Sequence, residues 1–178
     1  MPALDTAQLK ALLALCDAAA TTQDKGKAFE DLIADLFSQI PGVEIIERNV
    51  LNAFMTEEVD IGLWNDRAPD GLYFLPFQLL VECKNWSHAV GSAEVAYFIA
   101  RMVERGCDHG FLFAANGVTG EPAELTRAQF QIATALGRGR RVIVITRADV
   151  ETLNTTEDFA ALVKRRLCQL MASGTAVL

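Results

Sequence analysis

Histidine and paired cysteines are scarce in this sequence, which excludes the commonest zinc sites. The chain has two histidines and four cysteines, and the cysteines (Cys16, Cys83, Cys107 and Cys168) are scattered without a CxxC pair. A structural zinc site needs clustered Cys and His ligands, so none is predicted. Isolated thiols are typical of reduced cysteines packed in a cytoplasmic protein, and this is the location we expect.

Long apolar runs and glycine-rich phosphate loops are also missing. No stretch reaches the roughly 18 apolar residues that span a bilayer, so we expect no membrane segment. Residues 1–20 carry acids and leucines at helical spacing, which predicts a helix and not a signal peptide. Neither GxGxxG nor GxxxxGK[ST] occurs, which argues against a nucleotide-binding α/β domain.

An excess of basic charge is absent as well. The formal net charge is −7, which is unfavourable for gripping a polyanion. The acids concentrate in residues 1–90, however, and residues 91–178 are nearly balanced. Arg138, Arg140 and Arg141 form a local basic cluster that we predict to contact DNA; the alternative is that they are solvated arginines between a helix and a strand.

The 178 residues contain 51% apolar side chains, enough for one domain with a sizeable core. Apolar periodicity predicts a first helix capped by Thr6, then helices over residues 25–40, 91–106 and 121–136, and a last one from Thr155 or Thr156 to about Met171. Strands are predicted over residues 43–50 (an edge), 58–64, 73–84, 111–115 and 141–146. This order describes a single α/β domain with a mixed sheet. Residues 1–23 form an N-terminal helical extension, residues 24–147 the core, and residues 148–178 a C-terminal helix and tail.

Chemistry is suggested first by Val81-Glu82-Cys83-Lys84-Asn85, at the end of an apolar strand. Glu82 and Lys84 are two residues apart and therefore share one face of that strand, while Cys83 points into the core. Two buried charges cost several kcal/mol unless something compensates them, and a metal ion with a phosphodiester would do so. Glu82 and the backbone carbonyl of Cys83 offer hard oxygen ligands, and Lys84 offers a cation beside the attacking water.

Two acids compete to be the second carboxylate. Asp70 follows a proline, but it lies in a turn 12 residues before Glu82, roughly 40 Å away along an extended strand. Asp60 lies on the partner strand of the predicted hairpin, where antiparallel pairing brings it within about 5 Å of Glu82. Because the second strand is longer, this pairing requires a bulge or a long turn. We predict Asp60 as the ligand.

Further polar side chains come from the second helix. Glu30 flanks its apolar stripe and is the third candidate acid, either directly catalytic or simply an exposed helix acid. Lys25 and Lys27 precede it near a helix N-terminus, which is a favourable seat for phosphate. Trp86 follows the Glu82 strand and is a candidate for stacking on DNA, although packing is the commoner role of such an aromatic.

The chain resembles the PD-(D/E)XK nuclease superfamily, with its restriction-endonuclease-like fold, and within it the Mrr-type restriction endonuclease domain. The resemblance rests on Lys25-Gly26-Lys27-Ala28-Phe29-Glu30, Glu58-Val59-Asp60-Ile61-Gly62 and Val81-Glu82-Cys83-Lys84-Asn85-Trp86. It implies a mixed β-sheet flanked by helices, in the core order helix-strand-strand-strand-helix-strand. Two features depart from the pattern: Val59 stands where the motif has proline, and the Asp60–Glu82 gap includes an extended hairpin.

The resemblance implies a DNA endonuclease that uses Mg²⁺, with Mn²⁺ able to substitute, and that leaves a 5′-phosphate. Its catalytic residues would be Asp60, Glu82, Lys84 and Glu30. Restriction of foreign DNA is the expected setting, with a homodimer and protein partners of a defence system. The alternatives are a Holliday-junction-resolvase-like repair nuclease and a catalytically silent binding subunit of the same fold.

Overall fold

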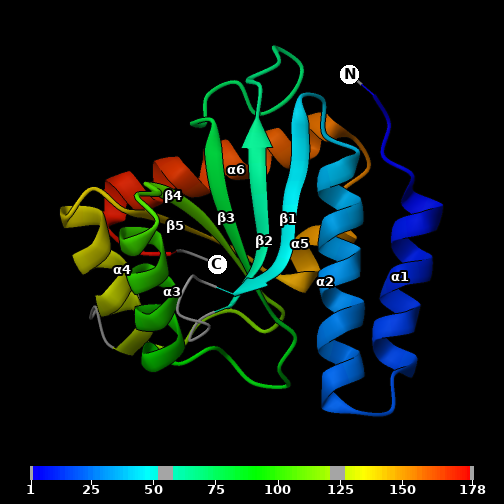
Figure 1. Ribbon diagram of the computed structural model, residues 1–178, viewed down its shortest axis with the longest axis horizontal. Coiled ribbons are helices and arrows are strands. Elements are labelled where there is room, and N and C mark those ends of the chain that lie inside the picture. The colour runs from blue at the N-terminus through cyan, green and yellow to red at the C-terminus, as the bar shows by residue number, and fades with distance from the viewer. Residues whose placement is uncertain (1, 52–57, 121–126, 177–178) are drawn as a thin grey trace.

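A computed structural model describes residues 2–51, 58–120 and 127–176 as a mixed five-stranded sheet between two layers of helices (Figure 1). The strands β1 (Val43–Leu51), β2 (Glu58–Asn65), β3 (Gln78–Lys84), β4 (His109–Ala114) and β5 (Arg141–Ile145) lie side by side in chain order. The pairs β1–β2 and β2–β3 are antiparallel, whereas β3–β4 and β4–β5 are parallel. The predicted mixed sheet and the edge position of β1 are confirmed.

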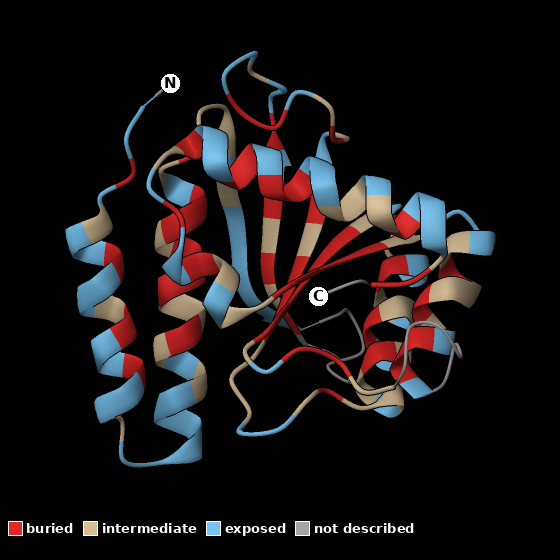
Figure 2. Cartoon of the chain, turned by 180° about the vertical axis from the view of Figure 1, so that it is seen from behind, coloured by how far each residue is buried: buried red, intermediate tan, exposed pale blue. Residues whose placement is uncertain are grey.

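Helices cover both faces of the sheet. The helices α2 (Thr22–Ser38), α5 (Arg147–Glu151) and α6 (Thr156–Ser173) pack on one face, and α3 (Ser92–Glu104) with α4 (Arg127–Gly137) on the other. The helix α1 (Thr6–Ala18) packs against α2. Figure 2 shows α6 crossing the strands on the first face. The short helix α5 was not predicted. None of the helices in the described residues is long and apolar enough to cross a membrane.

Side chains alternate between the two faces along the central strands. On β3, Leu79, Val81 and Cys83 enter the core beneath α2 and α6, whereas Leu80 packs on the side of α3. The strand β4 is buried on both faces, as parallel strands between helix layers usually are. The predicted inward direction of Cys83 is confirmed, and Glu82 is therefore directed to the α3 side.

The predicted strand over residues 73–84 is wrong in its first part. Strand β3 begins at Gln78, and residues 66–77 form a loop instead. The buried side chain of Asn65 donates hydrogen bonds to the carbonyls of Leu72 and Pro76, at 2.9 and 3.2 Å. These carbonyls therefore have hydrogen-bond partners without pairing to a strand. Pro76 also lacks the backbone N–H that a β-strand would donate to its neighbour.

Helix starts also differ from the prediction. Asp5 caps α1 in place of Thr6, because its carboxylate accepts a hydrogen bond from the Gln8 amide at 2.9 Å. Helix α2 begins at Thr22, three residues before the predicted start, because Thr21 caps it by accepting a hydrogen bond from the Asp24 amide at 3.1 Å. The prediction that Thr155 caps α6 is confirmed. Residues 121–126 of the predicted fourth helix lie outside the described residues.

Candidate active site

The carboxylate of Glu82 lies near the end of β3 and is held by two cations. Its side chain is only 4% exposed, and its Oε1 lies 2.7 Å from Lys84 Nζ. The other oxygen, Oε2, accepts a hydrogen bond from Arg101 Nη1 at 2.6 Å. Lys84 was predicted to share this face, whereas Arg101 on α3 was not predicted. Both oxygens of a buried acid are thus compensated by positive charge, as burial requires.

The hairpin brings Asp60 to the same place. Ile61 pairs with Val81 across β2 and β3, so the next residues outward, Asp60 and Glu82, lie side by side on one face. Asp60 Oδ2 also accepts a hydrogen bond from the backbone amide of Cys83 at 2.6 Å. The loop of residues 66–77 is the long turn that this pairing required, and Asp70 is exposed within it, beyond the far end of β3.

Burial and the charge of Glu82 raise the pKa of Asp60 to about 7, against the stabilising hydrogen bond from Cys83. A carboxyl group with such a pKa is partly protonated at neutral pH. When no metal ion lies between them, Asp60 and Glu82 repel each other, and this repulsion destabilises the folded state when both are ionised.

Lys84 is held in its charged form. Burial lowers the pKa of Lys84, but the charge and hydrogen bond of Glu82 outweigh burial, so the pKa stays above its ordinary value. Lys84 is therefore an ammonium at neutral pH. It can stabilise negative charge on a phosphate, but it holds no lone pair with which to take a proton from water.

A cavity of about 420 Å³ opens at the end of β3, lined by Lys27 and Glu30 of α2 and by Cys83, Lys84 and Trp86. Asp60 and Glu82 are not among its lining residues. The structure thus brings Glu30 and Lys27 to the β3 end, and the charge of Glu30 contributes to the raised pKa of Asp60. An adjoining cavity of about 480 Å³ is lined by Lys25 and Trp86. Asn85 links the end of β3 to α2, because its Nδ2 donates a hydrogen bond to the Lys25 carbonyl at 3.0 Å.

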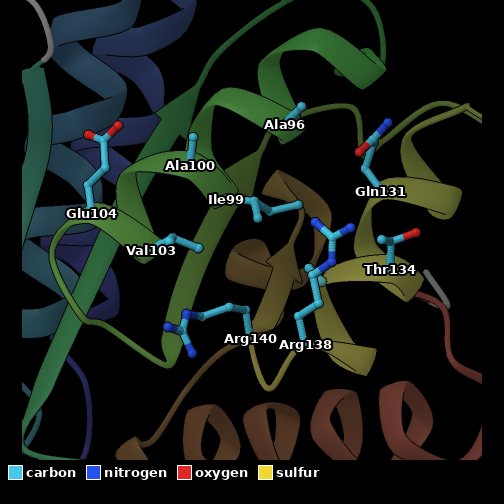
Figure 3. A pocket seen from close by; sticks show the side chains of 10 residues that line it. Ala96, Ile99, Ala100, Val103, Glu104, Gln131, Thr134, Arg138 and Arg140 are labelled. Carbon is cyan, nitrogen blue, oxygen red and sulfur yellow. The ribbon is translucent and has the colours of Figure 1, made fainter.

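The predicted arginine cluster lies elsewhere. Arg138 and Arg140 border a cavity of about 360 Å³ between α3 and α4 (Figure 3), and Arg140 pairs with Asp108 at 2.7 Å. Arg141 pairs with His109 at the start of β4, whereas Lys84 pairs with Ala114 at its end. Five residues of strand, about 16 Å, separate the two positions. DNA contact at these arginines stays a prediction, and it would involve a part of the DNA remote from Glu82.

Asp60 and Glu82 together can bind a hard divalent cation, because they supply carboxylate oxygens and repel each other when no metal ion lies between them. No group of three or more His, Cys, Asp or Glu side chains in the described residues is arranged to hold a metal ion. The side-chain donors are therefore two carboxylates, Asp60 and Glu82, which the Cys83 carbonyl and water can complement. Oxygen donors of this kind suit Mg²⁺ and Mn²⁺. A metal ion between the acids would offset both the burial and the repulsion by Glu82 that raise the pKa of Asp60.

These pKa shifts predict how the stability of the metal-free protein depends on pH. Because the folded-state pKa of Asp60 is raised to about 7, the folded protein retains a proton that the unfolded chain releases, and stability falls as pH rises through 7. Burial, with the charge of Arg141, lowers the pKa of His109 to about 4, so this second group opposes stability as pH falls below 6.5. From pH 6.5 to 8 the first effect is the larger. His109 of the unfolded chain is half protonated at pH 6.5, so its contribution offsets about half of the loss due to Asp60.

We therefore expect the melting temperature in EDTA to fall by about 1–2 °C between pH 6.5 and 8, corresponding to about 0.4 kcal/mol. Differential scanning fluorimetry would measure it. The fall should be absent in Asp60→Asn, where His109 alone would give a slight rise. A fall of the same size in that variant would assign the titration to another group.

The fold and the site together define a class of protein. A mixed sheet that carries an Asp on one strand and a Glu-x-Lys on its neighbour is restriction-endonuclease-like. The chain belongs to the Mrr-type restriction endonuclease family, because residues 22–154 match the model of that family's catalytic domain, described as a restriction endonuclease. The match runs from α2 to just before α6 and leaves out α1. No curated protein matches the chain. Family membership makes the protein a restriction-type nuclease.

Proposed function

We propose that this protein is a metal-dependent endodeoxyribonuclease that hydrolyses phosphodiester bonds in foreign DNA. One observation carries the proposal: Asp60, which is partly buried, lies beside the buried Glu82, and the ammonium of Lys84 lies 2.7 Å from Glu82. A silent binding subunit would have no chemical use for two repelling carboxylates, which destabilise the fold near neutral pH. Their presence in a member of a nuclease family supports catalysis.

Each residue has a role in this proposal. Asp60, Glu82 and the Cys83 carbonyl hold Mg²⁺ or Mn²⁺; the ion, when bound, supplies positive charge for the phosphate and an acidified water. Lys84 keeps its ammonium beside Glu82 and stabilises the charge that develops on the scissile phosphate. Glu30 lines the same cavity and adds negative charge near Asp60. The expected products carry a 5′-phosphate and a 3′-hydroxyl.

The surface around the cavity supplies the contacts that the net charge of −7 does not. Lys25 and Lys27 lie in the first turns of α2, where the helix N-terminus adds partial positive charge. Trp86 lines both cavities, and Lys84 Nζ lies 6.0 Å from its ring centre. A DNA backbone that enters the site would therefore meet two lysines and an aromatic ring.

The setting follows from the chemistry of the substrate. Cleavage of both strands by a domain with one active site requires two copies, so we propose a homodimer on DNA. Restriction of foreign DNA takes place in the cytoplasm, and protein partners of a defence system would meet the enzyme there. Analytical ultracentrifugation of the protein with and without a DNA duplex would measure whether it forms this homodimer.

Cleavage of a supercoiled plasmid tests the function. We expect nicked and linear products with Mg²⁺ or Mn²⁺, and none with EDTA, because two carboxylates without a cation cannot hold an acidified water. Cleavage that persists in EDTA, or no cleavage with either metal, would contradict the proposal. A four-way junction run beside linear duplex of the same sequence separates the two nuclease roles: preference for the junction would indicate a resolvase.

A further inference from the structure

Arg101 is the least expected part of the site, because one cation already compensates Glu82. Lys84 reaches Oε1 at 2.7 Å, and Arg101 reaches Oε2 at 2.6 Å from the opposite element, α3. The side chains of these two cations are 24% and 20% exposed, so neither is well solvated. Two cations are therefore placed on one carboxylate.

The guanidinium is also incompletely satisfied where it lies. Its Nε is buried and has no hydrogen-bond partner within the part of the chain that the structure describes. A buried donor without a partner costs about 1–3 kcal/mol. Among the described residues, Arg101 is thus held at Glu82 through one short contact and retains an unmet hydrogen-bonding group. It can therefore leave at lower cost than a fully bonded arginine would.

We propose that Arg101 is a positioning residue that occupies Glu82 when no metal is bound and competes with the divalent cation for Oε2. This inference rests on the proposed metal-dependent function. A metal ion bound to Oε2 of Glu82 would weaken the hydrogen bond that this oxygen accepts from Arg101. In addition, a nearby guanidinium repels a divalent cation. Arg101 therefore stabilises the metal-free fold and lowers the affinity of the site for metal. The enzyme is held inactive at low metal concentration.

The test is the binding of Ca²⁺ alone, measured by isothermal titration calorimetry, together with the melting temperature in EDTA. We expect Arg101→Gln to bind Ca²⁺ about tenfold more tightly than the unaltered protein, since it loses both the competitor and the repulsion. Its melting temperature in EDTA should be lower, and saturating Ca²⁺ should close most of that gap. Arg101→Lys keeps the charge and should bind within about threefold of the unaltered protein.

Arg166→Gln is the matched control. Arg166 forms another partly buried ion pair, with Asp149 at 2.8 Å, beneath α6 on the other face of the sheet. Its loss should lower the melting temperature and leave the affinity for Ca²⁺ unchanged. Unchanged or weaker binding by Arg101→Gln would overturn the proposal.

Two further measurements separate the possible failures. In the unaltered protein the ¹⁵N resonance of the Arg101 side chain, identified by its absence from Arg101→Lys, should shift as Ca²⁺ is added. A stationary resonance would overturn the proposal even if Arg101→Gln does not fold. If the unaltered protein binds no metal, the proposed function fails along with this inference. If it binds and loses binding in Asp60→Asn while Arg101→Gln is unaffected, only the inference fails.

Discussion

Replacement of Asp60 by asparagine is expected to abolish DNA cleavage and, at the same time, to raise the melting temperature of the metal-free protein at pH 8. Asparagine removes a metal ligand, and we expect a loss of cleavage of about 10³-fold or more. It also removes the charge that burial and Glu82 oppose, and its side-chain oxygen can still accept the Cys83 amide. The gain should be about 1–3 kcal/mol, or about 2–4 °C for each kcal/mol.

Plasmid cleavage and thermal melting in EDTA measure the two effects on one preparation. Asp70→Ala is the control, because Asp70 is an exposed loop acid and should alter neither quantity. Active Asp60→Asn together with inactive Asp70→Ala would mean that Asp70 is the true ligand. A drop in the melting temperature of Asp60→Asn would show that Asp60 stabilises the fold and would remove the argument from repulsion.

The second large effect is expected for Lys84→Ala. The variant loses the ammonium beside the scissile phosphate, and we expect cleavage to fall by about 10²–10⁴-fold. The fold should survive because Arg101 still holds Glu82 at 2.6 Å. The melting temperature should fall by only a few degrees, since removal of one of two partners does not leave the buried acid uncompensated.

Single-turnover cleavage with saturating Mg²⁺ measures the loss, and circular dichroism checks the fold. Lys10→Ala, on the exposed side of α1, controls for the loss of one positive charge. Lys84→Arg should recover only part of the activity, because a guanidinium is a broader and more weakly hydrated charge than an ammonium. Activity of Lys84→Ala equal to that of Lys10→Ala would refute the catalytic assignment.

The sequence was sufficient to predict that Asp60 and Glu82 come together. Period-two alternation placed each acid on a strand, and antiparallel pairing then brought the two acids to one face. Arg101 was missed because it comes 19 residues after Glu82. Its contact with Glu82 depends on how α3 packs against β3 in the tertiary structure, which the sequence pattern does not give. A local signal was present: Arg101 lies between the buried Phe98 and Met102, at the border of the apolar stripe of α3.

The failed strand start has a different cause. Residues 73–77 are rich in apolar side chains and read as strand by composition, but Tyr73 and Phe77 are 45% and 49% exposed. Their conformation is set by the side chain of Asn65, whose hydrogen bonds to the loop carbonyls connect residues 7 to 11 positions apart. A buried amide that organises a distant loop leaves no periodic trace in the sequence.

The same loop gives this nuclease a place where its chain can be altered. Residues 66–77 leave the sheet at the end of β2 and β3 that is remote from Glu82, and the register that holds the two acids is fixed by pairs from Ile61–Val81 to Trp64–Gln78. A foreign segment grafted into the tip of this loop, around Asp70, would leave those pairs intact. The fold therefore offers a fusion point at which a DNA-recognition module could redirect cutting without rebuilding the catalytic end.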